Sequence, residues 1–180
     1  PGVDKISFTG STATGKRIAA SAAPRMKKYT LELGGKSPVV IAEDANLSEA
    51  IPGAAWAIFG NHGQNCCAGS RLFIHERHYD EVLAGVAEIA RSIKLGAGLD
   101  PEAQMGPLVH VAHRDSVLGW IGEGLQAGGS LVCGGRAVQG AGAYIEPTIM
   151  SGLPHEASTV QKEIFGPVLA AFSFADDDEA

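Results

Sequence analysis

The stretch Gly63–Arg71 reads GQNCCAGSR and lies between a helix-like run, residues 47–59, and a strand-like run, residues 72–74. It contains two adjacent cysteines, Cys66 and Cys67, among small and amide-bearing residues. A thiol acts as a nucleophile when it is partly exposed and when positive charge or backbone N–H groups stabilise its thiolate. A helix or a nest of N–H groups beginning here would stabilise both a thiolate and an oxyanion. The stretch therefore predicts a helix–loop–strand unit that carries a reactive cysteine within the pair Cys66 and Cys67.

The cysteine pair could instead be structural, metal-binding or disulfide-bonded, and these residues alone leave those possibilities open. Free cysteines are commonly buried and inert. His62 and Cys66 have an i, i+4 spacing that could bind a metal, although further ligands at finger-like spacing are missing. A disulfide between Cys66 and Cys67 would be strained. His62 could also serve as the base of a thiol-dependent hydrolase, although no Asn or Asp is placed to orient it.

On both sides of this stretch, strand-like and helix-like patterns alternate. For example, residues 79–93 carry an apolar stripe at helical spacing. Trp56 and Phe59 lie on another apolar helical run, and we assign both side chains to the core. The predicted strands cover residues 5–9, 29–33, 38–42, 72–74, 130–133, 144–146 and 168–174, and the predicted helices cover residues 13–23, 47–59, 79–93 and 109–127. Such alternation predicts an α/β fold with a largely parallel sheet flanked by helices.

A second candidate catalytic segment, Leu31–Pro38, reads LELGGKSP. Glu32 stands inside an apolar run, and burial would raise its pKa toward the range of a general base at neutral pH. The two glycines that follow permit a tight turn where a ligand could come close. An edge-strand glutamate that faces solvent is the alternative. Lys36 is assigned to a surface or structural ion pair rather than to a catalytic amine.

Composition and charge exclude several classes of protein. The net charge of −6 over 180 residues leaves no basic stripe for nucleic acid. No apolar run approaches the ~20 residues needed to span a bilayer, and the first residues lack the pattern of a signal peptide. Three cysteines, two of them adjacent, do not make a disulfide framework. We therefore predict a cytoplasmic protein without a nucleic-acid or membrane partner.

Three segments, taken together, resemble the aldehyde dehydrogenase superfamily. The first is Phe8–Thr12, FTGST, followed by Gly15. The second is Leu31–Pro38 running on to Gly63–Arg71, and the third is Glu163–Val168, EIFGPV. Their order and spacing are similar to the layout of the family, and the resemblance covers essentially the whole chain.

The resemblance implies a chemistry for the candidate catalytic residues. Cys66 would attack an aldehyde to give a thiohemiacetal, a hydride would pass to NAD or NADP, and Glu32 would activate the water that hydrolyses the resulting thioester. The backbone N–H of Cys66 would form half of the oxyanion hole. Branches of the superfamily that transfer the acyl group to coenzyme A tend to lack this glutamate, so a free carboxylic acid is the expected product. Cys67 and Cys133 would be structural.

The resemblance also implies the residues that contact the cofactor. Gly10 and Ser11, in the turn that opens a helix, would contact the pyrophosphate. The backbone of Leu33 would contact the nicotinamide carboxamide. Glu163 would bind the nicotinamide ribose, and Phe165 would pack near the nicotinamide ring. No metal is implied.

The family's chain is much longer, which leads to an expectation for the domains. Residues 1–32 would be the last part of a Rossmann-like cofactor-binding domain, and residues 33–180 a catalytic domain truncated at its C-terminal end. Because part of the cofactor site and one oxyanion-hole side chain would then be missing, we expect the isolated chain to have little or no dehydrogenase activity. Exposed sheet edges predict a homo-oligomer.

A non-catalytic binding or scaffold module with the same fold is the alternative function. Both hypotheses predict the same architecture, and they differ in the reactivity of Cys66. An enzyme needs an activated thiol, whereas a scaffold does not.

Overall fold

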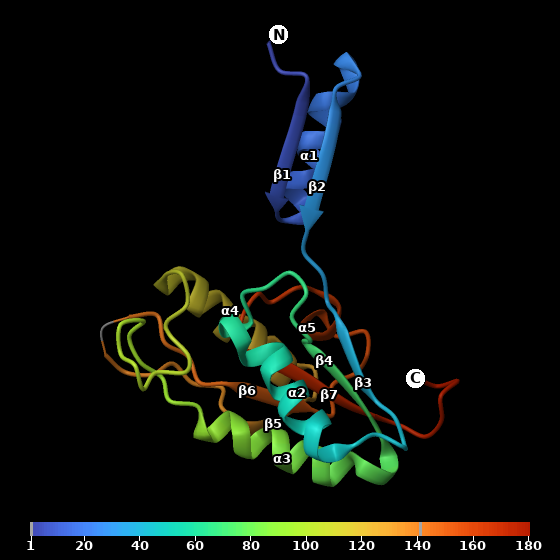
Figure 1. Cartoon of the computed structure of the whole chain (residues 1–180), viewed down its shortest axis with the longest axis vertical. Helices are drawn as coiled ribbons and strands as arrows, with labels where there is room; N and C mark the ends of the chain where they lie inside the picture. The colour runs from blue at the N-terminus through green and yellow to red at the C-terminus, as the bar shows by residue number, and fades with distance from the viewer. Residues whose placement is uncertain (1, 141) are drawn as a thin grey trace. The chain divides into compact units, whose positions relative to one another are not determined.

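The first of two compact units ends at Gly35 and consists of one strand–helix–strand unit. The computed structural model describes residues 2–140 and 142–180. Strand β1 (Lys5–Gly10), helix α1 (Thr12–Ala22), the short 3₁₀ turn η1 (Ala23–Arg25) and strand β2 (Lys28–Leu33) follow one another (Figure 1). β1 and β2 pair in parallel, in register from Lys5–Lys28 to Gly10–Leu33.

Helix α1 packs closely against the strands of this unit. Ser11 caps the helix, because its side-chain oxygen accepts a hydrogen bond from the backbone N–H of Thr14. Gly15 is buried, and a Cβ placed there would come within 2.7 Å of Leu33 Cδ2. A glycine at this position therefore lets the helix approach β2.

The second unit, Lys36–Ala180, is a five-stranded sheet with helices. Its elements are β3 (Pro38–Ile41), α2 (Leu47–Phe59), β4 (Arg71–His75), α3 (Tyr79–Ser92), α4 (Val111–Gln126), β5 (Ser130–Cys133), β6 (Thr148–Ser151), α5 (Ser158–Gln161) and β7 (Val168–Phe174), with short 3₁₀ segments η2 (Gly60–Gly63) and η3 (Glu76–His78). The strand order is β3-β4-β7-β6-β5; the β5–β6 pair is antiparallel and the other pairs are parallel. The predicted α/β class with a largely parallel sheet is confirmed.

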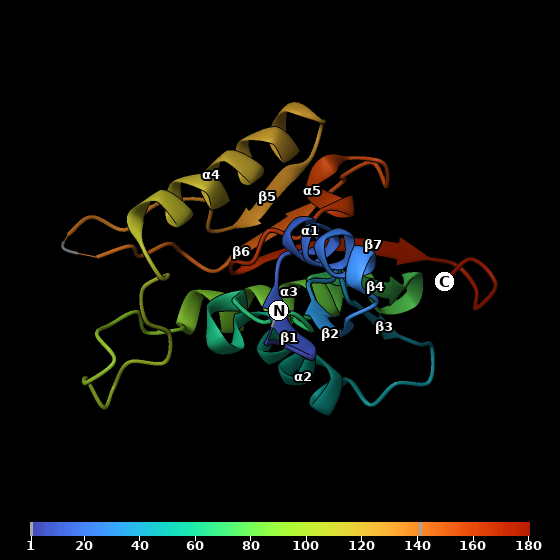
Figure 2. The ribbon, with the colours of Figure 1, turned by 90° about the horizontal axis from the view of Figure 1, so that it is seen from above.

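Helices cover both faces of this sheet. Figure 2 shows α4 and α5 on one side of the strands and α2 and α3 on the other. Successive strand residues point to opposite faces. On β6, Ile149 belongs to the core cluster that includes residues of α2 and α3, and Met150 to the cluster that includes residues of α4 and α5. The sheet is therefore buried on both faces, as parallel sheets usually are.

The central strands bring the candidate segments to one edge of the sheet. β3, β4 and β7 are neighbours and run parallel, so their amino ends share one edge. Residues 36–37 precede β3, residues 60–70 precede β4, and residues 163–167 precede β7. Motifs far apart in the sequence therefore meet at the amino edge of the sheet.

One predicted strand was wrong. Residues 144–146 make only an isolated bridge, Ala137 with Ile145, and the sheet strand is Thr148–Ser151. The reason lies in the pairing of the backbone: Tyr144 O accepts a bond from Val138 N, and Glu146 N donates to Arg136 O. This extended run is therefore engaged with the neighbouring loop, and the chain joins β7 only after Pro147.

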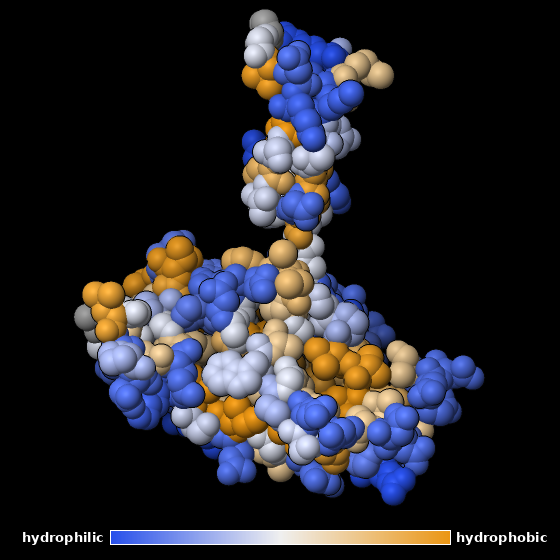
Figure 3. Space-filling model, in the orientation of Figure 1, coloured by the Kyte–Doolittle hydropathy of each residue, from blue (hydrophilic) through white to orange (hydrophobic). Residues whose placement is uncertain are grey.

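Apolar side chains also reach the surface. Figure 3 shows apolar patches among hydrophilic side chains on the visible face. Phe59 is fully buried as predicted, whereas the core assignment of Trp56 was wrong, because 42% of its surface is exposed. Among the described residues, no helix combines the length and the apolar character that a membrane span requires.

Candidate active site

Cys66 lies in a turn that links α2 to β4. The turn, here called the Cys66 turn (residues 63–70), is closed by a hydrogen bond from Ala68 N to Asn65 O at 3.1 Å. Gly69 N donates to Ala57 O at 2.9 Å and so ties the turn to α2. Ser70 O accepts from Ala170 N at 3.0 Å, which ties it to β7. The nucleophile candidate is thus held from two directions by backbone contacts.

Both cysteines of the pair are exposed thiols. Asn65 Oδ1 accepts from Cys67 Sγ at 3.3 Å and lies 3.8 Å from Cys66 Sγ. The exposure contradicts a buried, inert thiol at Cys66 and also at Cys67, whose expected structural role requires burial. No helix begins at Cys66, so of the two possible sources of thiolate stabilisation the helix N-terminus was wrong, and a nest of backbone N–H groups stays a prediction. Cys133 is half-buried, in agreement with a structural role, and burial raises the pKa of its thiol.

His62 is engaged in structure rather than in catalysis. Its Nε2 accepts a hydrogen bond from the backbone N–H of Gly106 at 2.8 Å. This bond occupies the lone pair that a base for Cys66 would need, which argues against the thiol hydrolase. Within residues 2–140 and 142–180, no group of three or more His, Cys, Asp or Glu side chains is arranged to hold a metal ion.

The Cys66 turn packs directly on the loop that precedes β7, here called the 163–167 loop. Gly63 has a φ of 66°. A Cβ at Gly63 would lie 2.2 Å from the carbonyl oxygen of Gly166 and 2.9 Å from Pro167 N. Only a residue without a side chain permits this contact between two backbone segments.

Gly63→Ala is therefore expected to destabilise the second unit by more than ~2 kcal/mol, because the clash is with backbone atoms and the left-handed φ adds strain. Urea unfolding followed by tryptophan fluorescence measures this, since Trp56 and Trp120 both lie in the second unit. Gly53→Ala is the matched control: Gly53 lies within α2 with open space around it, and alanine should stabilise there by up to ~1 kcal/mol. Equal stability of the two variants would contradict the proposed packing.

Lys36, at the amino edge of the sheet, is half-buried as a residue, and its side-chain nitrogen is buried. Its Nζ has no hydrogen-bond partner among the described residues. Burial and the positive charge of Arg71 lower the pKa of Lys36 to about 8, and the negative charge of Glu163 opposes that change. Arg71 also donates from Nε to Lys36 O at 2.9 Å and from its backbone N–H to Ser37 O at 3.2 Å. The side chains of Lys36, Arg71 and Glu163, which come from three separate segments of the second unit, therefore interact electrostatically at this edge.

The lowered pKa of Lys36 predicts a pH-dependent stability. Between pH 8 and 10.5 the unfolded chain holds this proton and the folded chain does not, so the contribution of Lys36 to stability rises with pH in that window. At pH 7, Lys36→Met should be more stable than the unaltered chain by up to ~3 kcal/mol, and the gap should close toward pH 10. Urea unfolding at both pH values tests this.

Lys94→Met is the control for the Lys36 prediction. Lys94 is 64% exposed and pairs with Glu102 on the surface, so its replacement should leave the pH dependence unchanged. A stability gap for Lys36→Met that stays constant from pH 7 to 10 would contradict the buried charge.

The 163–167 loop carries two of the predicted cofactor residues. Glu163 is half-buried, and the Phe165 side chain is 41% exposed. Phe165 has a φ of 58°, and its carbonyl oxygen accepts a hydrogen bond from Nε2 of His113 at 2.7 Å. Sequence reasoning missed His113, because its partner is 52 residues away and no local pattern marks it.

The remaining predicted residues belong to the first unit. Glu32 is exposed on β2, opposite Thr9 of β1, so within this unit the carboxyl group is not buried as expected. The side chain of Leu33 packs against α1 at Gly15. Gly10 and Ser11 lead into α1, whose first turn contains no acidic residue. That helix N-terminus is therefore electrostatically suited to an anion.

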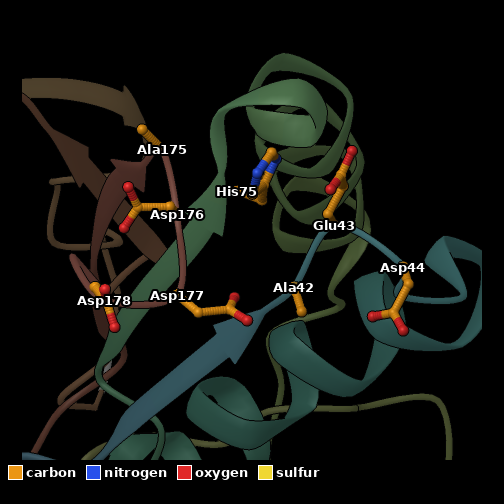
Figure 4. Close-up of a pocket in the computed structure, with 8 residues that line it drawn as sticks. All are labelled: Ala42, Glu43, Asp44, His75, Ala175, Asp176, Asp177 and Asp178. Carbon is orange, nitrogen blue, oxygen red and sulfur yellow. The ribbon is translucent and has the colours of Figure 1, made fainter.

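A hollow lies at the opposite edge of the sheet. About 680 Å³ in volume, it lies at the carboxyl ends of β3, β4 and β7 (Figure 4). It is lined by Ala42, Glu43, Asp44, His75, Ala175, Asp176, Asp177 and Asp178. The Cys66 turn precedes β4, whereas His75 ends it, so this acidic hollow and the candidate nucleophile lie at opposite ends of the same strand.

The comparisons with known proteins agree on one family. The model of the aldehyde dehydrogenase family matches residues 1–180. The relative named DhaS, from Bacillus subtilis (strain 168), is 48% identical over 177 residues, which cover 98% of this chain and 36% of that protein. The phenylacetaldehyde dehydrogenase of Pseudomonas fluorescens is 44% identical over 178 residues, with 98% and 36% covered.

Solved structures give the same result. The structure of an NAD⁺ complex of aldehyde dehydrogenase from Bacillus cereus superposes with a TM-score of 0.97 at 45% identity, covering 98% of this chain and 36% of that one. The chain thus spans about a third of the length of the relatives it matches. The family model matches all 180 residues and the fold matches over 98% of the chain, so the chain belongs to the aldehyde dehydrogenase family.

Proposed function

We propose that this chain carries the acyl-transfer centre of an enzyme that oxidises an aldehyde to a carboxylic acid with NAD⁺ or NADP⁺. The observation that carries the proposal is the exposed Cys66 thiol in a turn that packs on the 163–167 loop. Family membership supports the reaction class. The Pseudomonas fluorescens relative is named for phenylacetaldehyde, which supports an aldehyde as the substrate.

Cys66 is the nucleophile in this proposal. Its thiolate attacks the aldehyde carbon, a C–S bond forms, and the carbonyl oxygen takes up the negative charge. The backbone N–H of Cys66 donates to that oxygen. The thiohemiacetal then loses the hydrogen of its C–H bond with both electrons, and the oxygen reforms a carbonyl. The product on the protein is a thioester at Cys66.

Glu32 completes the cycle as the general base. Its carboxylate takes a proton from water while the water oxygen attacks the thioester carbon. The C–S bond breaks, the carboxylic acid leaves, and Cys66 is again a thiolate. An exposed carboxylate on β2 can exchange the proton with solvent, which supports repeated turnover.

The cofactor residues are assigned to separate parts of one molecule. When bound, NAD⁺ or NADP⁺ supplies the hydride acceptor. The N-terminus of α1, with Gly10 and Ser11, would hold the pyrophosphate, since it carries no acidic side chain in its first turn. The Leu33 backbone would hold the carboxamide. Glu163 would accept a hydrogen bond from a ribose hydroxyl, and the exposed ring of Phe165 would pack near the nicotinamide.

Four expectations stay predictions. They are the assignment of residues 1–32 to a cofactor-binding domain, the assignment of residues 33–180 to a catalytic domain, the homo-oligomer and the cytoplasmic compartment.

The acyl-transfer centre itself can be tested without the cofactor. An activated ester such as 4-nitrophenyl acetate would acetylate Cys66, forming the thioester bond and releasing 4-nitrophenol. Mass spectrometry should find the acetyl group on Cys66, and acetylation confined to lysines or to Cys67 would contradict the proposal.

A further inference from the structure

Phe165 has a backbone conformation that must be held by its surroundings. Its φ of 58° lies in the left-handed region, where a residue with a bulky side chain is under strain. Such conformations persist only where neighbouring structure fixes them, and they gather at functional sites. The Phe165 side chain is nonetheless 41% exposed, so burial of the ring does not supply the restraint.

His113 supplies a direct restraint from α4. Its Nε2 lies 2.7 Å from the carbonyl oxygen of Phe165. The two rings are also neighbours, with centroids 6.3 Å apart and planes tilted by 59°. A carbonyl oxygen only accepts hydrogen bonds, so Nε2 of His113 must carry the proton.

The position of His113 is itself fixed by the start of α4. The backbone N–H of His113 donates to the ring Nδ1 of His110 at 3.0 Å and to its carbonyl oxygen at 3.1 Å. One helical turn further, Val117 packs on Gly166, where a Cβ would come within 2.7 Å of Val117 Cγ2. The 163–167 loop therefore lies between α4 on one side and Gly63 of the Cys66 turn on the other.

We propose that His113 is a positioning residue: its Nε2–H hydrogen bond holds Phe165 in the left-handed conformation and keeps the Phe165 ring presented for the nicotinamide. The part of this inference that concerns the nicotinamide rests on the proposed function. The part that concerns the backbone of Phe165 does not, and the two parts are tested separately.

The backbone part is tested by hydrogen exchange. In His113→Leu, amide exchange in a peptide spanning residues 162–168 should accelerate on the order of tenfold, the effect of one lost hydrogen bond. His113→Gln keeps a side-chain N–H donor and should remain within about twofold of the unaltered chain. Unchanged exchange in His113→Leu, or equal acceleration in both variants, would overturn the proposal.

A matched control and a spectroscopic readout separate positioning from general destabilisation. His78 makes the same kind of bond, Nε2 to the carbonyl oxygen of Glu43 at 2.7 Å, away from the loop. His78→Leu should leave the 162–168 peptide unchanged. In ¹⁵N NMR, neutral His113 should carry its proton on Nε2, and a proton on Nδ1 alone would overturn the proposal.

The functional part uses NAD⁺ as the probe. His113→Leu should weaken NAD⁺ binding by about the same factor as Phe165→Ala, and the double variant should be no weaker than Phe165→Ala alone. Additive losses would overturn the coupling. Absence of NAD⁺ binding by the unaltered chain would count against the proposed function, while hydrogen exchange would still decide the role of His113.

Discussion

Replacing Cys66 with alanine is expected to abolish acetylation by 4-nitrophenyl acetate, with the initial burst of 4-nitrophenol lowered by about 10³-fold or more. The reason is that the nucleophile itself is removed, and the proposal gives Cys67 no part in the reaction. Stopped-flow absorbance gives the burst, and intact-mass spectrometry gives the stoichiometry of acetylation.

Cys67→Ala is the matched control for Cys66→Ala. Cys67 is also exposed, and its thiol also reaches Asn65 Oδ1. The burst should survive in this variant. Because both side chains are exposed, neither change should alter tryptophan fluorescence. A burst that disappears with Cys67 and survives without Cys66 would show that the second cysteine is the nucleophile.

Replacing Glu32 with glutamine is expected to leave the acetylation burst intact and to slow deacetylation by ~10²–10⁴-fold, the usual contribution of a general base. Glutamine keeps the shape of the side chain but cannot take a proton from water. The acetylated chain is isolated after the burst, and the loss of the acetyl group is followed by mass spectrometry.

Asp4→Asn is the control, since it removes another exposed carboxylate from the first unit. It should have no effect on deacetylation. Deacetylation of Glu32→Gln at the unaltered rate would mean that another base, or water alone, hydrolyses the thioester. The role of Cys66 would be unaffected by that result.

The elements with strong local patterns could be predicted from the sequence. Helix α2 begins at Leu47 and ends at Phe59 as predicted, because Asn46 caps it and its buried residues recur at helical spacing. Strand β7 also matches, because its first five residues, Val168–Phe172, form a continuous apolar run that is buried on both faces. The strand expected at residues 144–146 was misplaced because its apolar residues pair locally.

The candidate site could be predicted only in part. The identity of Cys66 and Glu163 as site candidates follows from the resemblance of their segments to a known family. The lowered pKa of Lys36 could not be predicted, because besides burial it depends on the charges of Arg71 and Glu163, which are distant in the sequence. The hydrogen bond between His113 and Phe165 could not be predicted either, because these residues are 52 positions apart in the sequence. Contacts of this kind arise from strand order, and no local pattern encodes them.

The exposure of Glu32 shows the limit of hydrophobic patterning. Its neighbours Leu31 and Leu33 face the helix side of a two-stranded sheet, and the alternation of β2 turns Glu32 the other way. An apolar run around a carboxylate therefore predicts the strand correctly, yet it does not predict burial of the carboxylate itself.

The central claim, that Cys66 is an activated nucleophile, is tested most directly by limiting iodoacetamide near neutral pH, with the labelled cysteine mapped by mass spectrometry. We predict fast and selective labelling of Cys66 over Cys67 and Cys133. Cys133 should be slowest, because it is half-buried and burial raises the pKa of its thiol. Labelling of Cys67 as fast as Cys66 would contradict the account, since exposure alone would then explain the reactivity of the pair.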